Sequence, residues 1–435
     1  TEPVFPCNYC LRHFTYARRA LGQNELFGAD AYWGLAFSLS TTFSIRPLPK
    51  KEEKKRKEKK IAVQPYASNL VPQEMDNPMK IIISLLLMTA ITTSALPALA
   101  EGNHQIFELG DFALEGGTVL PNAKLSYVTH GKLKADGSNV ILVPSAYLGD
   151  HHGFDFLIQP GLALDPEKYF IVATDMFQNG LSSSPSNTPA PFNGPNFPAI
   201  SIRDNVHATY RLLTEKFAVS HIKAVLGFSM GAQQAFQWAV SYPNFMDKVI
   251  GLAGSAVEYP HGAIRLEGFK AAIKADAQFL KGNYVQPPEL GLKAGGTHWA
   301  AWGTSQEWFR LGLYKEMGLK SSDDMIGFMQ SLVLSWDAND LLGLAATWQN
   351  NHVGNTPGFG GSAEKALGSI KAEVLYMPSQ TDMYFHIDAL SAEAKLIPNV
   401  TLAVIPTLWG HLAGLGVAAA DKSFINNHTA EFLQR

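Results

Sequence analysis

The sequence predicts an α/β fold, in which a mostly parallel, doubly wound sheet is covered by helices and carries an inserted helical cap. Three observations predict it. From residue 101 onward, short apolar runs that suit buried strands alternate with segments of helical periodicity. One such run passes through Gly227-Phe228-Ser229-Met230-Gly231 directly into a helical segment. The stretch 256–367 then interrupts this alternation, as an insertion would.

Composition is consistent with a large folded domain, and it does not indicate nucleic acid or an anionic membrane as a partner. The chain has 435 residues, of which 46% are hydrophobic and 11% aromatic, enough for a sizeable core. The formal net charge of -3 provides no electrostatic reason to expect nucleic acid or an anionic membrane as a partner. Both cysteines, Cys7 and Cys10, precede residue 11, so the rest of the chain can form neither a disulfide nor a thiolate metal site.

Residues 1–78 predict a disordered extension. Residues 1–30 resemble a degenerate plant-type zinc finger of the two-cysteine, two-histidine class, through Cys7, Cys10 and the residues around them. Residues 14–76 contain no histidine, and a tetrahedral zinc site needs four ligands, so we expect no metal there. The lysine- and glutamate-rich run 50–60 cannot bury apolar surface and indicates a solvated linker.

Residues 79–100 have the features of a secretory signal peptide. Met79-Lys80 precedes an apolar centre, and small residues close the segment at Ala98-Leu99-Ala100. We therefore expect a natural start at Met79, cleavage after Ala100, and a secreted or periplasmic protein without stable membrane association. A signal-anchored membrane form is the alternative, because residues 81–100 are just long enough to cross a bilayer. Polar residues and a proline between 89 and 97 weaken that alternative.

The remaining sequence divides into a core, 101–255 and 368–435, and a cap, 256–367. The cap has helical patterns at 308–316 and 322–334, with expected glycine-rich breaks at Gly295-Gly296 and at 358–361. An insertion here would cover the carboxyl ends of the strands, where sheets of this class bind ligands. Its tryptophans are expected mainly to pack. The core elements are predicted strands at 139–143, 169–173, 223–226, 248–252, 372–377 and 401–405, and predicted helices at 202–217 and 232–240.

The pentapeptide 227–231 predicts a sharp strand-to-helix turn that exposes Ser229 as a nucleophile. Its two glycines would let the backbone pass through the turn without steric cost. A serine hydroxyl is a weak nucleophile at neutral pH, so it needs a histidine base and a carboxylate that orients the base.

Asp382 and His411 are the predicted partners of Ser229. Each follows a predicted strand, in the chain order serine, acid, histidine that this kind of turn favours. The competing residues lack such positions; they are His261, His298, His352, His386 and His428, and Asp337, Asp340 and Asp388.

The negative charge that develops on a substrate oxygen needs main-chain donors. The residue after the nucleophile supplies one, which assigns Met230. The loop after the 139–143 strand should supply the second, for which Tyr147 is the first choice and Ala146 the reserve.

With these residues in place, the chain resembles the homoserine O-acetyltransferase-like branch of the α/β-hydrolase superfamily over about residues 105–430. The resemblance rests on the 146–150 loop, the 227–231 turn, Trp336-Asp337-Ala338-Asn339 and the loop of His411. It implies the α/β-hydrolase fold, and the family's catalytic positions coincide with Ser229, Asp382 and His411.

The sequence departs from that branch where the acceptor binds. Leu412 and Ser335 replace an aspartate and an arginine typical of the acetyltransferases, and Phe228 and Ala232 replace glycines in the turn. We therefore expect an exported, esterase-like serine hydrolase that acts on a small ester and needs neither a cofactor nor a metal. One alternative is transfer of an acetyl group from acetyl-CoA to a small hydroxyl acceptor. Another is a catalytically inactive regulatory protein that carries a zinc finger. The sequence sets no oligomeric state.

Overall fold

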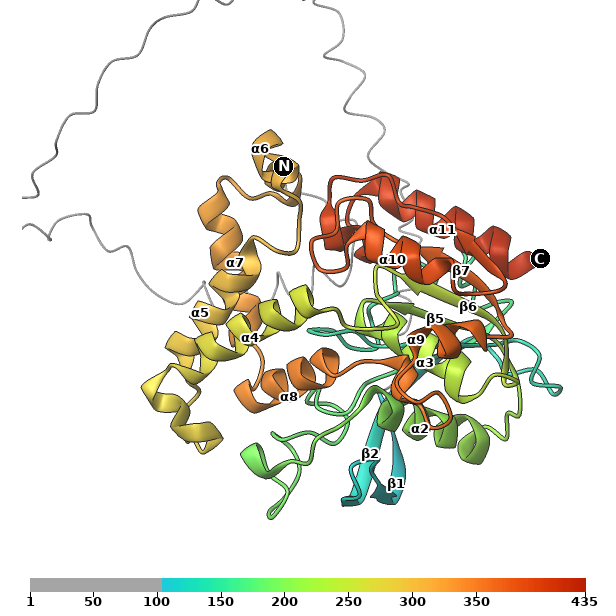
Figure 1. The fold of residues 1–435 in the computed structure, drawn as a ribbon, viewed down its shortest axis with the longest axis horizontal. Coiled ribbons are helices and arrows are strands. Elements are labelled where there is room, and N and C mark those ends of the chain that lie inside the picture. The colour runs from blue at the N-terminus through green and yellow to red at the C-terminus, as the bar shows by residue number, and fades with distance from the viewer. Residues whose placement is uncertain (1–103) are drawn as a thin grey trace, which may run out of the picture. The chain divides into compact units, whose positions relative to one another are not determined.

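The computed structural model describes residues 104–435 (Figure 1). The finger-like segment, the charged linker and the predicted signal peptide lie outside the described residues. Eight strands form one sheet in the order β1-β2-β4-β3-β5-β6-β7-β8. The strands are β1 Gln105–Ala113, β2 Val119–His130, β3 Val140–Pro144, β4 Phe170–Thr174, β5 Ile222–Phe228, β6 Met246–Leu252, β7 Glu373–Met377 and β8 Val400–Leu402.

The sheet is parallel from β4 to β8, and the predicted fold class is confirmed. Only β1 and β2 run antiparallel to their neighbours, at one edge. Val225 pairs with Val249, which pairs with Val374, so the carboxyl ends of these strands share one edge of the sheet. β3, β4 and almost all of β5 and β7 are buried, as expected for strands covered on both faces. The strand predicted at 401–405 is shorter, because the regular pairing ends at Leu402 and Ile405 forms only an isolated bridge to Ser379.

Helices from the core pack against this sheet. α3 follows β5 and contacts β3, β5 and β6, while α11 contacts β7. Ser201 begins α2 with a capping box shared with Asp204. In residues 104–435 we find no helix with the length and hydropathy needed to span a bilayer. The core helices are α2 Ile202–Arg211, α3 Met230–Ser241, α10 Ile387–Ala394 and α11 Ala419–Gln434; short turns of helix occur at Gly194–Asn196, Leu212–Lys216 and Gly410–Leu415.

The segment between β6 and β7 is mainly helical, and we keep the name cap for it. Figure 1 shows α4 to α8 gathered on one side of the sheet. Among them, α5 contacts both α4 and α7, and α4 also contacts α8. The helices are α4 Pro260–Lys274, α5 Glu289–Ala300, α6 Gln306–Leu311, α7 Ser322–Leu334, α8 Ala338–Gln349 and α9 Ala363–Gly368, with short turns at Ala277–Gly282, Leu313–Met317 and Val353–Asn355.

The break expected at Gly295-Gly296 is wrong, because α5 runs straight through it. A β-carbon on Gly295 would lie 2.8 Å from the ring of Phe269 in α4. One on Gly296 would lie 2.5 Å from the main chain of Gln330 in α7. These glycines therefore permit close helix packing rather than a break, which periodicity along one segment does not reveal.

Candidate active site

Ser229 occupies a strained turn between β5 and α3. Its φ of 56° and ψ of -122° lie in a region that residues with side chains rarely adopt. The neighbouring glycines act differently from our expectation, because the positive φ belongs to the serine and to neither glycine. A β-carbon on Gly227 would lie 2.0 Å from the main-chain oxygen of Gly231, and one on Gly231 would lie 2.7 Å from that of Pro144. Both positions therefore need glycine, because main-chain atoms of other residues approach them too closely for a side chain.

Gly227→Ala should therefore destabilise the protein by about 3 kcal/mol, because a methyl group would overlap main-chain atoms that cannot rotate away. The measurement is the free energy of unfolding in urea. Gly327→Ala is the matched control: it lies in α7, and no atom comes within 4 Å of the added carbon. It should stabilise the protein by about 0.5–1 kcal/mol. Equal effects of the two substitutions would contradict this account of the turn.

The structure brings Ser229, His411 and Asp382 into one hydrogen-bonded chain. His411 Nε2 lies 3.0 Å from Ser229 Oγ, and His411 Nδ1 lies 2.8 Å from Asp382 Oδ2. The other carboxylate oxygen of Asp382 accepts main-chain hydrogen bonds from Tyr384 and Phe385 at 2.7 and 3.2 Å. All three residues are buried, and they lie in the segments that follow the carboxyl ends of β5, β7 and β8. The histidine tautomer follows from the Asp382 contact, which suits an Nδ1–H donor.

Aromatic rings hold the His411 imidazole. The rings of Tyr384 and Phe228 have centroids 4.4 and 4.7 Å from it, and that of Phe385 lies 5.6 Å away. Phe228, which replaces a glycine of the acetyltransferase-like turn, therefore contacts the predicted base.

Met230 and Tyr147, the predicted main-chain donors, both lie beside the hydrogen-bonded chain of Ser229, His411 and Asp382. Met230 begins α3, and Tyr147 follows β3 in a loop that Gln234 holds through a 3.0 Å hydrogen bond from Nε2 to the main-chain oxygen of Ser145. Among the hydrogen bonds of residues 104–435, none has the main-chain N–H of Met230 or Tyr147 as donor. The Tyr147 side chain has a separate role, because its hydroxyl donates to the main-chain oxygen of Leu341 in α8 at 3.2 Å. Ala146, the reserve candidate, lies in the same loop.

A cavity of about 110 Å³ opens on Ser229 and His411. Drug-sized ligands usually occupy roughly 300–1,000 Å³, so this space suits a small molecule. Trp299 and Trp348, which were expected to pack, line it, as does Leu412, which follows His411. The remaining apolar wall comes from both the core and the cap, and its cap residues include Met317, Met325, Met329 and Leu332.

Arg265 is a buried cation that sequence reasoning missed. Its guanidinium lies 4.2 Å from the ring centroid of Tyr384, 4.8 Å from that of Trp348 and 4.9 Å from that of Trp299. Within the described residues, none of its three side-chain nitrogens has a hydrogen-bond partner. It therefore contacts the rings that form the cavity wall through cation–π interactions. Nothing along α4 marks this residue, because its burial depends on packing against α5 and α8.

Glu258 is a second buried ionisable residue near this wall. Its carboxylate accepts a hydrogen bond from Trp348 Nε1 at 2.6 Å. Burial raises the pKa of Glu258 to about 8, against the opposing influence of the Arg265 charge. In the unfolded chain the pKa is about 4.3. The contribution of the neutral carboxyl to stability is complete below that value and is lost as pH rises to about 8.

We expect the free energy of unfolding to fall between pH 5 and pH 8, and to fall less steeply in Glu258→Gln. The glutamine is neutral at every pH, so the variant does not lose stability through ionisation of a buried side chain at this position. Urea unfolding of both proteins at pH 5, 6.5, 8 and 9 measures the difference. An identical pH slope in the variant would show that Glu258 does not titrate as the geometry indicates.

Comparisons with known proteins agree with the fold. A family model described as "alpha/beta hydrolase fold" matches residues 139–415. Ethyl acetate hydrolase from Pseudomonas veronii is 38% identical over 340 residues, which cover 77% of this chain and 97% of that protein. The structure of an acetylester hydrolase from Corynebacterium glutamicum superposes with a TM-score of 0.74 and 35% identity, over 76% of this chain and 96% of its own.

A homoserine O-acetyltransferase from Methanosalsum zhilinae matches a shorter part of the chain. It is 38% identical over 201 residues, which cover 42% of this chain and 40% of that protein. The family match begins at residue 139, so the finger-like interpretation of residues 1–30 gains no support from it.

Proposed function

The chain belongs to the α/β-hydrolase family, and from this premise we propose that it hydrolyses small esters, acetate esters above all, through an acyl-enzyme on Ser229. The observation that carries the proposal is the hydrogen-bonded chain from Ser229 through His411 to Asp382, which opens on a small apolar cavity. Similarity to an ethyl acetate hydrolase and to an acetylester hydrolase supports the substrate class.

In the proposed mechanism, His411 Nε2 takes the proton of Ser229 as Oγ attacks the ester carbonyl carbon. The main-chain N–H groups of Met230 and Tyr147 hold the oxyanion that forms, and Asp382 keeps the imidazole oriented. His411 then gives its proton to the departing alkoxide, which leaves as the alcohol. Water, deprotonated by His411, next attacks the acyl carbon and releases the acid and free Ser229.

Acetyl transfer from acetyl-CoA to a small hydroxyl acceptor is the second candidate, favoured by the partial similarity to a homoserine O-acetyltransferase. Leu412 is an argument against acetyl transfer. An apolar side chain that lines the cavity directly after His411 offers no charge to bind an acceptor's amino group. The apolar wall suits an ester with a short alkyl group, and water as the acyl acceptor.

One experiment with the full chain separates the two candidates. Acid release is measured with ethyl acetate and with p-nitrophenyl esters from acetate to octanoate, and CoA release from acetyl-CoA is measured with and without homoserine. We expect rapid hydrolysis of the acetate esters, a decline with acyl length, and no homoserine-dependent CoA release. Homoserine-dependent CoA release without ester hydrolysis would overturn the proposal. Export remains a prediction from residues 79–100, and the mass of the mature N-terminus tests it.

A further inference from the structure

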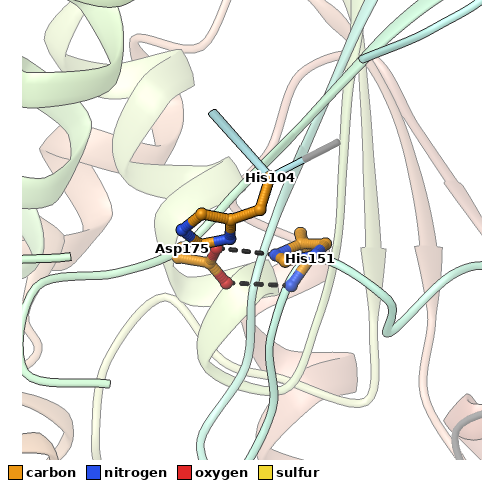
Figure 2. Close-up of side chains that lie close together, drawn as sticks. All are labelled: His104, His151 and Asp175. Atoms are coloured by element: carbon orange, nitrogen blue, oxygen red, sulfur yellow. Dashed lines mark hydrogen bonds and ion pairs between the residues drawn. The ribbon is translucent and has the colours of Figure 1, made fainter. Parts of the chain in front are cut away.

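A second cluster of ionisable side chains lies outside the hydrogen-bonded chain of Ser229, His411 and Asp382 and has no part in the proposed mechanism, although one of its members, His151, also lines the cavity. His104 precedes β1, His151 lies in the loop after β3, and Asp175 follows β4. Figure 2 shows the two imidazole rings beside the Asp175 carboxylate. One potential ligand atom from each residue lies within 4.8 Å of the other two. In residues 104–435 this is the one group of three such residues close enough to share a metal ion.

Asp175 is held firmly at the centre of the cluster. It is fully buried, and its Oδ1 accepts from the main-chain N–H of His151 at 2.9 Å and from Asn179 Nδ2 at 3.1 Å. Its Oδ2 lies 2.6 Å from Ser126 Oγ and 2.7 Å from His151 Nδ1. Hydrogen bonds from neighbouring groups fix the orientation of metal-binding carboxylates in the same way. The Asp175 carboxylate is therefore already oriented before any ion binds.

Ser126 links the third member to this centre. Its Oγ lies 3.1 and 3.0 Å from the two ring nitrogens of His104. The centroids of the His104 and His151 rings are 5.5 Å apart. His104 is exposed while the other two are buried, so one side of the cluster is open to an arriving ion.

We propose that His104, His151 and Asp175 form a zinc site. Two imidazole nitrogens and one carboxylate oxygen suit Zn²⁺, whereas Mg²⁺ and Ca²⁺ take oxygen ligands. Zinc bonds of about 2.0–2.2 Å place tetrahedral ligand atoms roughly 3.3 Å apart. His151 Nδ1 and Asp175 Oδ2, which lie 2.7 Å apart, must therefore separate by roughly 0.6 Å, and His104 must approach them by about 1.5 Å at most. His104, with its exposed side chain, can make that movement. A water molecule would be the fourth ligand of the ion.

Binding moves one proton of His151. The hydrogen between His151 Nδ1 and Asp175 Oδ2 leaves Nδ1 as Zn²⁺ takes its place, because the imidazole must be deprotonated at the ligating nitrogen, and the neutral ring then carries its one hydrogen on Nε2. The ion joins the chain before β1 to the ends of β3 and β4. It stabilises the folded state, because the three ligands are brought together only in the folded state.

The test uses the full chain carrying Cys7→Ser and Cys10→Ser, so that thiolates near the N-terminus cannot supply zinc ligands. Metal-free protein is titrated with ZnCl₂ by calorimetry, and thermal unfolding is followed at each zinc concentration. We expect one Zn²⁺ per chain and a Tm that rises with zinc. In the same background His104→Ala should weaken binding more than about 100-fold, beyond the loss typical of residues that only support ligands.

His221→Ala is the matched control. His221 is exposed and its Nε2 lies 2.8 Å from Asp247 Oδ1, so it forms a histidine–carboxylate pair without a third ligand. Its loss should leave zinc affinity and the Tm shift unchanged. Absence of binding, or binding that His104→Ala leaves intact, would overturn the proposal. Equal weakening by His104→Ala and His221→Ala would also overturn it, because it would show unspecific binding to surface histidines. Neither result depends on esterase activity, so the zinc site and the proposed function fail or stand separately.

Discussion

Ser229→Ala should lower kcat for acetate esters by a factor on the order of 10⁶, since removal of the nucleophile eliminates the acyl-enzyme route. Activity left over would come from main-chain donors at Met230 and Tyr147 and from substrate binding. The same substitution should abolish labelling by a fluorophosphonate, which forms a covalent bond to an activated serine.

Its control is Ser423→Ala, which removes an exposed hydroxyl on α11 and should leave both labelling and kcat unchanged. Urea unfolding checks that Ser229→Ala is folded. A folded Ser229→Ala protein that still hydrolyses esters within tenfold of the native rate would refute the acyl-enzyme mechanism.

Asp382→Asn should lower kcat by a factor on the order of 10⁴ with little change in fold. The remaining oxygen can still accept the main-chain hydrogen bonds of Tyr384 and Phe385. The amide nitrogen, however, would donate toward His411 Nδ1 and favour the tautomer that protonates Nε2, which could no longer accept the serine proton.

Steady-state kinetics on p-nitrophenyl acetate measure this loss, and KM should change far less than kcat. Asp388→Asn is a suitable control because that carboxylate lies exposed on α10, next to the same loop. A drop of less than about tenfold for Asp382→Asn would mean that another group orients the imidazole.

The elements that the sequence predicts well share a physical cause. Runs such as 140–143 and 224–226 are continuously apolar because both faces of a central parallel strand are buried. Ser229, Asp382 and His411 could be selected because parallel strands end at one edge of the sheet, which places loops distant in sequence side by side. Their hydrogen-bonded geometry agrees with that selection, and their catalytic roles await the substitutions above.

What the sequence could not supply depends on packing between distant segments. Arg265 lies in a helix with no pattern that marks its inner face, and the rings around it come from α5, α8 and the loop after β7. Likewise, nothing in the spacing of His104, His151 and Asp175 shows that their side chains meet. The boundaries between core and cap are our interpretation, because they separate two parts of the chain by the roles we assign to them and not by a contact.

The spread of the hydrogen-bonded chain along the sequence also bears on how activity returns after denaturation. Ser229 and His411 are 182 residues apart, with the whole cap between them. Closing so long a loop is costly, so contacts of this kind form late in folding. A collapsed intermediate with β3 to β6 already paired would contain the strained serine but no base beside it. Recovery of esterase activity should thus lag behind recovery of secondary structure, making catalysis a reporter of the last step of folding.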